Sequence, residues 1–221
     1  MVGSIGDFSR GIIPRAEEQV MKTNQELEHQ GWTYFIEVSA VQVYNEQVSD
    51  LFHPSGDKGV SIHLRNNKVS IPGLTQVPVN SSGEVNKLLQ QAMRGRKTAS
   101  TAMNTSSSRS HCVFTLHLVG SNPAHGDMLC GQLKVVDLAG SGRIARSKVK
   151  GNDHIPFRRS KLTSLLKDSF LTGGKVQMIV NVSSDRESAL ETLQSLRFAT
   201  MANACALGTP NRRAIPKRSK K

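Results

Sequence analysis

The sequence predicts an α/β protein with a mixed central sheet and helices on both faces. Segments with the apolar patterns of strands alternate along the chain with segments whose apolar residues have helical spacing. Glycine and proline separate many of these segments, as expected of turns. With 221 residues, 37% of them hydrophobic and 21% charged, the chain can form one compact domain with a substantial core.

The first third of the chain predicts a helix, a strand and a group of short hairpins. A helical pattern runs from the Gly11–Pro14 segment to Gly31, with proline in its first turn and glycine after its end. Residues 34–40 alternate like a strand, and Asn45 is expected to open a short helix that ends near Phe52. Residues 59–79 predict short strands at a sheet edge, because apolar residues alternate there between Gly and Pro turns.

The remainder predicts helices and buried strands in turn. Ser81 and Glu84 are spaced as a capping box for the next helix. Two strands are then expected at 112–119 and 132–138, and Ser160 should begin another helix. Residues 176–182 form a continuous apolar run typical of a buried strand, and a last helix is expected from about 188 to 204.

Positive charge is concentrated in two segments. The formal net charge is +12. Residues 143–161 contain seven Lys or Arg and one Asp, and residues 208–221 contain six Lys or Arg and no acid. Clustered charge favours an acidic partner surface. Nucleic acid, anionic lipid and an acidic protein polymer are all compatible with this pattern.

Composition also narrows the class of protein. No apolar run approaches the roughly 18 residues of a membrane helix, and residues 1–10 lack the features of a secretory signal, so a cytoplasmic or nuclear protein is expected. The three cysteines lie far apart, which predicts reduced thiols rather than disulfides or a zinc site. No known motif for binding nucleic acid is present, and tyrosine and tryptophan do not alternate with the basic runs.

Two polar motifs precede and follow the expected strands at 112–119 and 132–138. Residues 104–111 (N-T-S-S-S-R-S-H) contain five hydroxyls, a guanidinium and an amide, groups that bind phosphate, Mg²⁺ or carboxylates. Residues 137–142 (D-L-A-G-S-G) follow an apolar strand. In phosphoryl-transfer proteins an Asp in this position holds the Mg²⁺ shell, and the later glycine contacts the γ-phosphate. Alone, the first motif also fits a phosphorylated serine-rich loop, and the second an ordinary strand-to-turn exit.

Together and in this order, the two motifs resemble the switch I and switch II motifs of kinesin motor domains. Residues 11–15, 43–51, 155–166 and 191–202 agree with the same family. The resemblance covers nearly all of residues 1–207, which we interpret as a partial motor domain, and residues 208–221 as a disordered basic tail. The ending from Asn203 to Cys205 is similar to kinesins with a C-terminal motor, which usually move toward microtubule minus ends.

The resemblance implies functional roles for particular residues. It places ATP and Mg²⁺ beside a set of switch residues, with Ser108 and Asp137 near the metal, the latter through water, and the Gly140 N–H at the γ-phosphate. It places three basic residues against tubulin. The full set is Asn104, Ser107, Ser108, Arg109, Asp137 and Gly140 for the nucleotide, and Arg158, Arg159 and Lys161 for the microtubule. A location on cytoskeletal microtubules, including the spindle, is implied as well.

The sequence departs from the family in three places. No stretch fits the phosphate-binding G-x-x-x-x-G-K-[ST] loop, which in the family precedes the segment equivalent to residues 11–15. Losing four phosphate hydrogen bonds of about 1.5 kcal/mol each would weaken binding by about four decades. Gly142 replaces a family glutamate that pairs with the switch I arginine. Only residues 143–155 fill a gap that holds a long tubulin-binding insertion in the family.

These departures leave several interpretations. The sequence could be an incomplete record of an ATP-driven motor. Alternatively, it could be a nucleotide-independent microtubule-binding module or the partner of a second kinesin-like chain. A non-functional remnant and a basic nucleic-acid-binding domain are the remaining alternatives. The family's sheet contains a strand that precedes residue 11, so an open, aggregation-prone sheet edge is expected unless a partner covers it.

Overall fold

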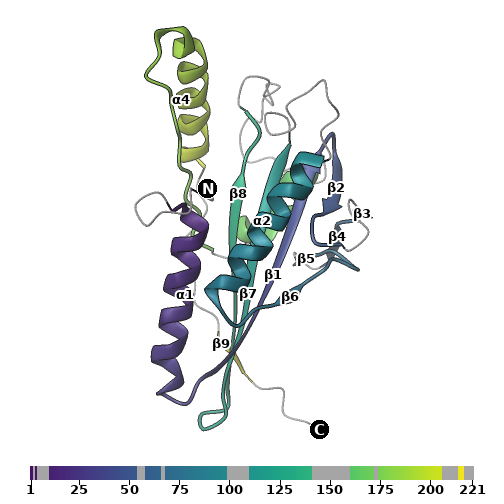
Figure 1. Ribbon diagram of the computed structural model, residues 1–221, viewed down its shortest axis with the longest axis vertical. Coiled ribbons are helices and arrows are strands. Elements are labelled where there is room, and N and C mark those ends of the chain that lie inside the picture. The colour runs from purple at the N-terminus through teal and green to yellow at the C-terminus, as the bar shows by residue number, and fades with distance from the viewer. Residues whose placement is uncertain are drawn as a thin grey trace. The chain divides into compact units, whose positions relative to one another are not determined.

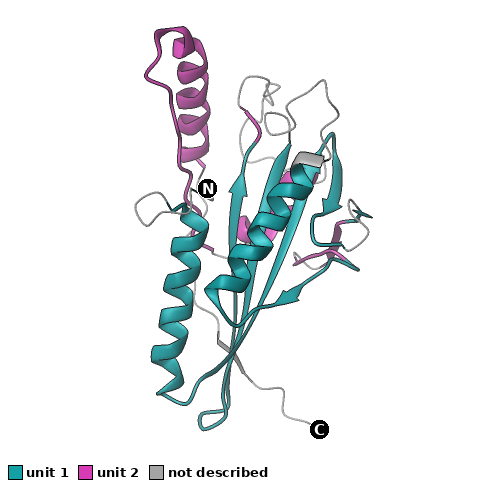
Figure 2. Cartoon of the chain, viewed as in Figure 1, with its two compact units in different colours: residues 1–61, 72–138, 212–221 teal, residues 62–71, 139–211 magenta. Residues whose placement is uncertain are grey.

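The computed structural model describes residues 1, 3, 10–53, 58–65, 68–98, 110–140, 160–171, 174–205 and 214–216. The chain forms two compact units (Figure 2). Unit 1 comprises residues 1–61, 72–138 and 212–221, and unit 2 comprises residues 62–71 and 139–211. The single domain predicted over residues 1–207 stays a prediction.

Unit 1 is built on a seven-stranded sheet. Its long strands are β1 (Thr33–Tyr44), β7 (His111–Asn122) and β8 (Asp127–Asp137), and its short strands are β2 (Gln47–Asp50), β3 (Lys58–Gly59), β6 (Val77–Pro78) and β9 (Ala214–Pro216). The order is β3-β2-β1-β7-β8-β9, with β6 also beside β1. Between described strands, all the pairings are antiparallel. The predicted strands at 34–40, 112–119 and 132–138 are therefore confirmed.

The turn between β1 and β2 corrects one prediction. Asn45 and Glu46 have φ values of 47° and 57°, and the chain reverses there into β2 rather than into the expected helix. Two central residues with positive φ make a hairpin turn whose twist matches that of its strands. The helix was predicted wrongly because Val48 and Asp50 continue a period of two, with both side chains buried in the strand.

A second hairpin joins β7 to β8 and fixes their register. The buried Asn122 side chain accepts hydrogen bonds from the backbone N–H groups of Ala124 and His125, while Gly126 takes a positive φ of 72°. The strands then pair over eleven residues, ending with Cys112 opposite Asp137. This register brings the beginning of β7 beside the end of β8.

Helices α1 (Ile12–Glu28) and α2 (Ser82–Thr98) pack on one face of this sheet (Figure 1). The core joins Ile13 of α1 and Leu89 of α2 to Val38, Phe114 and Leu116 of the strands. Both helices were predicted, and the capping box of α2 is nearly as expected. Glu84 N–H donates to Ser81 Oγ at 3.4 Å, and the Glu84 carboxylate accepts from the backbone of Asn80 at 2.8 Å, one residue earlier than in the usual motif.

The outer edge of β8 is mostly open. On the side of β8 away from β7, β9 pairs only with Asp127–Leu129, and no described strand pairs there with Cys130–Asp137. The tail predicted to be disordered therefore contributes three residues to the sheet, while its other residues lie outside the described ranges.

Unit 2 contains the hairpin of β4 (His63–Arg65) and β5 (Lys68–Ser70), helix α3 (Lys161–Leu171), the short 3-10 helix Arg186–Ser188 and helix α4 (Ala189–Asn203). Helix α3 packs against β5. The helices and short strands agree with the sequence. The strand predicted at 176–182 does not form; the segment has no regular secondary structure, and Val176, Met178, Ile179 and Val182 are exposed.

Candidate functional site

The second polar motif begins at the end of β8. Asp137 is the last residue of this strand, and its side chain is 44% exposed. The register places it opposite Cys112, two residues after Ser110 of the first motif. The parts of the two motifs that the structure describes therefore lie side by side, because the β7–β8 hairpin returns the chain to the same end of the sheet.

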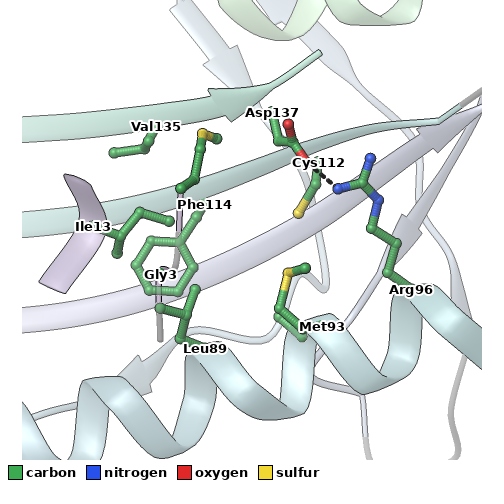
Figure 3. A pocket seen from close by; sticks show the side chains of 11 residues that line it. Gly3, Ile13, Leu89, Met93, Arg96, Cys112, Phe114, Val135 and Asp137 are labelled. Atoms are coloured by element: carbon green, nitrogen blue, oxygen red, sulfur yellow. Dashed lines mark hydrogen bonds and ion pairs between the residues drawn. The ribbon is translucent and has the colours of Figure 1, made fainter. Parts of the chain in front are cut away.

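Arg96 of α2 connects these two motifs. Its Nη1 forms an ion pair with Asp137 Oδ2, shown as a dashed line in Figure 3. Its Nη2 donates to the backbone oxygen of Ser110 at 2.8 Å, and its Nε donates to Ser110 Oγ at 3.3 Å. One guanidinium thus holds the last serine of the first motif and the aspartate that begins the second.

Burial makes this contact important for the stability of the site. The Arg96 residue is 3% exposed, and Ser110 is fully buried. A buried guanidinium is costly unless its donors are used and its charge is balanced. The fork geometry of arginine serves a carboxylate and a carbonyl at once, which a lysine could not do equally well.

Sequence reasoning did not single out Arg96, although a signal was present. The apolar face of α2 includes Val85, Leu89 and Ala92, spaced by four and three residues, and Arg96 continues this series four residues later. A charged residue on the buried stripe of a helix requires a partner. That partner, Asp137, is 41 residues away in the sequence.

The same surroundings shift the pKa values of two neighbouring side chains. Burial raises the pKa of the Cys112 thiol to about 11, so this thiol stays protonated and unreactive near neutral pH. Burial, together with the positive charge of Arg96, lowers the pKa of His111, so its imidazole is neutral at pH 7.

Of the two residues predicted near Mg²⁺, Ser108 and Asp137, the described ranges include Asp137 alone, so the metal site stays a prediction. The Asp137 carboxylate is already paired with a guanidinium, whose positive charge opposes a divalent cation. The described residues contain no group of three or more His, Cys, Asp or Glu side chains that could hold a metal.

The other predicted site residues are partly outside the described ranges. Gly140 is exposed in unit 2, and Lys161 is the exposed first residue of α3. The remaining predicted residues that lie outside those ranges are Asn104, Ser107, Ser108, Arg109, Arg158 and Arg159. Gly142 lies there as well, so its predicted effect on Arg109 stays a prediction. Within the described ranges, no helix is both long and apolar enough to cross a membrane.

Comparison with protein families identifies what the chain is similar to. The family described as Kinesin motor domain matches residues 1–152 and 147–205. The two matched stretches meet in the segment predicted to be shortened.

Individual proteins agree with the family match. Kinesin-like protein KIN-14D of Arabidopsis thaliana is 38% identical over 249 aligned residues, which cover 94% of this chain and 32% of that protein. The solved structure of a fast kinesin has a TM-score of 0.84 at 28% identity, covering all of this chain and 70% of the other.

A third similar protein is the C-terminal motor and motor homology domain of Kar3Vik1 fused to a synthetic heterodimeric coiled coil. It has a TM-score of 0.75 at 33% identity and covers 89% of this chain and 58% of the other. The chain spans about a third of the length of the curated relative described above.

Proposed function

The chain belongs to the kinesin motor domain family. We propose that it acts as part of a microtubule-based motor protein of the C-terminal-motor type. Its 221 residues carry the two switch motifs and basic residues for tubulin, and their binding of ATP is impaired. The observation that supports this most directly is the ordered pair of switch motifs together with the absence of a phosphate-binding loop sequence.

The proposed roles of the switch residues follow the family. Kinesin motors bind a nucleotide with Mg²⁺, and Asn104, Ser107, Ser108 and Arg109 would surround the γ-phosphate of such a nucleotide, with Gly140 contributing its N–H. Asp137 is proposed to have a different role within this chain: its pairing with Arg96 favours a link between the two switches over a metal site.

Steady-state phosphate release tests the nucleotide part of the proposal. Purified chain with ATP, Mg²⁺ and saturating microtubules should release no more phosphate than microtubules alone. Turnover that is abolished by Asp137→Ala would contradict the proposal, because it would show that this chain forms a working site without the loop.

Co-sedimentation tests the microtubule part. Reversing Arg158, Arg159 and Lys161 to Glu should weaken binding to microtubules at low salt by about tenfold or more, since the exposed surface of tubulin is acidic. The matched control reverses Lys217, Arg218 and Lys220 to Glu, which changes the net charge equally but in the tail. Equal losses in both variants would show that only overall charge matters and would contradict a specific tubulin site.

A second candidate function is that of a partner for another kinesin-like chain. The Kar3Vik1 structure, in which a motor and a motor homology domain are named together, favours this alternative. It predicts that a kinesin motor with an intact phosphate-binding loop co-purifies with this chain. Analytical ultracentrifugation of the mixture should then show one complex, and independent sedimentation of the two chains would exclude this role.

A further inference from the structure

Two segments of the chain have the character of strands but lack a partner strand. The first is the open edge of β8, the side of Cys130–Asp137 that faces away from β7, where no described strand pairs (Figure 1). The second is residues 175–182, which form no regular secondary structure. Among described residues, no backbone hydrogen bond joins residues 175–182 to another segment. Within the described part of the chain, both segments therefore have backbone groups available for pairing.

The side chains of residues 175–182 are typical of a strand inside a sheet. Val176, Met178, Ile179 and Val182 are exposed, and Ile179 has 56% of its surface in solvent. Apolar side chains on both sides of an extended segment are typical of strands that are covered on both faces. Adding this segment to a sheet edge would bury apolar surface and form backbone hydrogen bonds at the same time.

The two segments match in length and in the placement of charge. With the strands antiparallel and Lys175 opposite Asp137, the pairing extends along the whole open edge. It ends with Val182 opposite Cys130, next to the residues of β8 that already pair with β9. Asp137 is the last residue of β8 and is 44% exposed, so a lysine can approach it. A parallel alignment would place Lys175 at the other end of the open edge and lose this charge pair.

The same register also matches apolar side chains. It places Ile179 opposite Leu133, whose side chain packs against the core of unit 1. Successive side chains of a strand point to opposite faces, so a shift by one residue would move Ile179 to the face away from Leu133. The charge pair at the end of the strand and the apolar pair near its middle therefore favour one register.

We propose that residues 175–182 of one copy of this chain add as an antiparallel strand to the open edge of β8 in a second copy, with Lys175 opposite Asp137. One chain leaves both segments unpaired among its described residues, so a second copy supplies the strand. Each copy carries one open edge and one such segment, and a reciprocal exchange closes a symmetric dimer. This association needs neither nucleotide nor tubulin, so it does not rest on the function proposed above.

Disulfide trapping tests the register, because Cys130 is exposed on the open edge. Cys205→Ser serves as the background, since Cys205 is the other exposed cysteine. In this background, Val182→Cys should form a disulfide with Cys130 of the second copy under mild oxidation and run at twice the chain's mass on a non-reducing gel. Val176→Cys is the matched control, because Val176 is similarly exposed but lies at the other end of the strand, and it should give at least about fivefold less dimer.

The trapped species also distinguishes the alternatives. Adding Cys130→Ser to Val182→Cys should abolish the dimer. A dimer that persists in this variant, or equal yields from Val176→Cys and Val182→Cys, would overturn the register. A disulfide between positions 130 and 182 of the same chain would run at the mass of the monomer and would overturn the pairing between copies.

Analytical ultracentrifugation of the full chain tests the association without oxidation. The wild type should form a dimer whose fraction rises with concentration, and Ile179→Lys should weaken the association at least about tenfold, because it places a charge opposite Leu133. Leu190→Lys adds the same charge to α4 at a residue that is 76% exposed and should leave the association unchanged. Both positions are exposed, so circular dichroism should show both variants folded. A wild type that stays monomeric, or equal losses in the two variants, would overturn the proposal.

Discussion

Two apolar regions of the chain differ in how deeply their side chains are buried. In unit 1, the apolar residues of β1 and β7 are enclosed between strands and helices, and Phe114 is 1% exposed. In unit 2, most apolar residues between Val176 and Met201 are exposed, and Leu190 is 76% exposed. The difference shows that strand-like or helix-like patterning alone does not bury side chains, since burial also requires a neighbouring surface of complementary pattern.

Of the substitutions that test this comparison, one in the enclosed region of unit 1 should cause the largest loss of stability. Phe114→Ala removes a buried ring and should lower the free energy of unfolding by about 3–5 kcal/mol. Phe35→Ala is the matched control, because Phe35 lies on the same sheet but is 51% exposed, and it should cost less than about 1 kcal/mol. Urea denaturation followed by circular dichroism measures both. Similar losses in the two variants would show that the sheet faces do not differ as described.

The buried ion pair should give the next largest effect. Asp137→Ala removes the carboxylate that pairs with the buried Arg96 guanidinium, and the stability should fall by about 2–3 kcal/mol. This lies below the usual cost for fully buried pairs, because the aspartate is partly exposed. Adding Arg96→Met to Asp137→Ala should recover most of the loss, and the double-mutant cycle measures the coupling. Strict additivity would mean that the two side chains do not interact.

A buried carboxyl in unit 1 should make stability depend on pH. Glu17 of α1 is fully buried, and neither carboxylate oxygen makes a hydrogen bond in the structure. Burial raises the pKa of Glu17 above its ordinary value of 4.5, and the charge of Arg10 offsets this only in part. The folded state therefore holds the proton more tightly than the unfolded state does. The stabilisation is complete below pH 4.5 and is lost as the pH rises through the folded pKa.

Glu17→Gln keeps the shape and removes this titration. Relative to the wild type, the variant should gain stability as the pH rises above 4.5, with a slope of at most about 1.4 kcal/mol per pH unit. Chemical denaturation between pH 4 and 8 measures the difference. Glu18→Gln, at an exposed neighbouring position, is the control. Parallel pH profiles of wild type and Glu17→Gln would show that Glu17 does not titrate differently in the folded state.

A substitution in the exposed region of unit 2 should change the stability least. Leu190→Ala in α4 removes a side chain that is already in water, and alanine is a slightly better helix former, so the stability should change by less than about 0.5 kcal/mol. The same denaturation experiment measures it. A loss of about 2 kcal/mol or more would mean that α4 buries this leucine against a surface of the folded chain.

The sequence predicted the elements of the fold better than their contacts. The patterns of α1, α2, β7 and β8 are local, so they were recognised from residues that lie within one or two turns of each other. The hairpin at Asn45 and Glu46 was missed because positive φ values at residues other than glycine have little sequence signal. Residues 176–182 were predicted as a strand because their composition suits one, but strand pairing depends on a neighbour that no local pattern specifies.

In the candidate site too, the sequence predicted a local feature but not the contact that it makes. Asp137 was found from its position after an apolar strand, and the structure places it at the end of β8 as expected. Its partner was not found, because the pairing of Arg96 with a residue 41 positions away depends on the register of β7 and β8 and on the packing of α2. The other switch residues stay predictions.

The contact made by Arg96 also affects how chains of this kind are compared. The residue that joins the two motifs belongs to neither of them, since it lies on a helix that ends before the first motif begins. A survey that scores only the two motifs would count a chain with Arg96 replaced as intact. Position 96 should therefore be compared together with positions 110 and 137 when judging whether the two motifs remain connected.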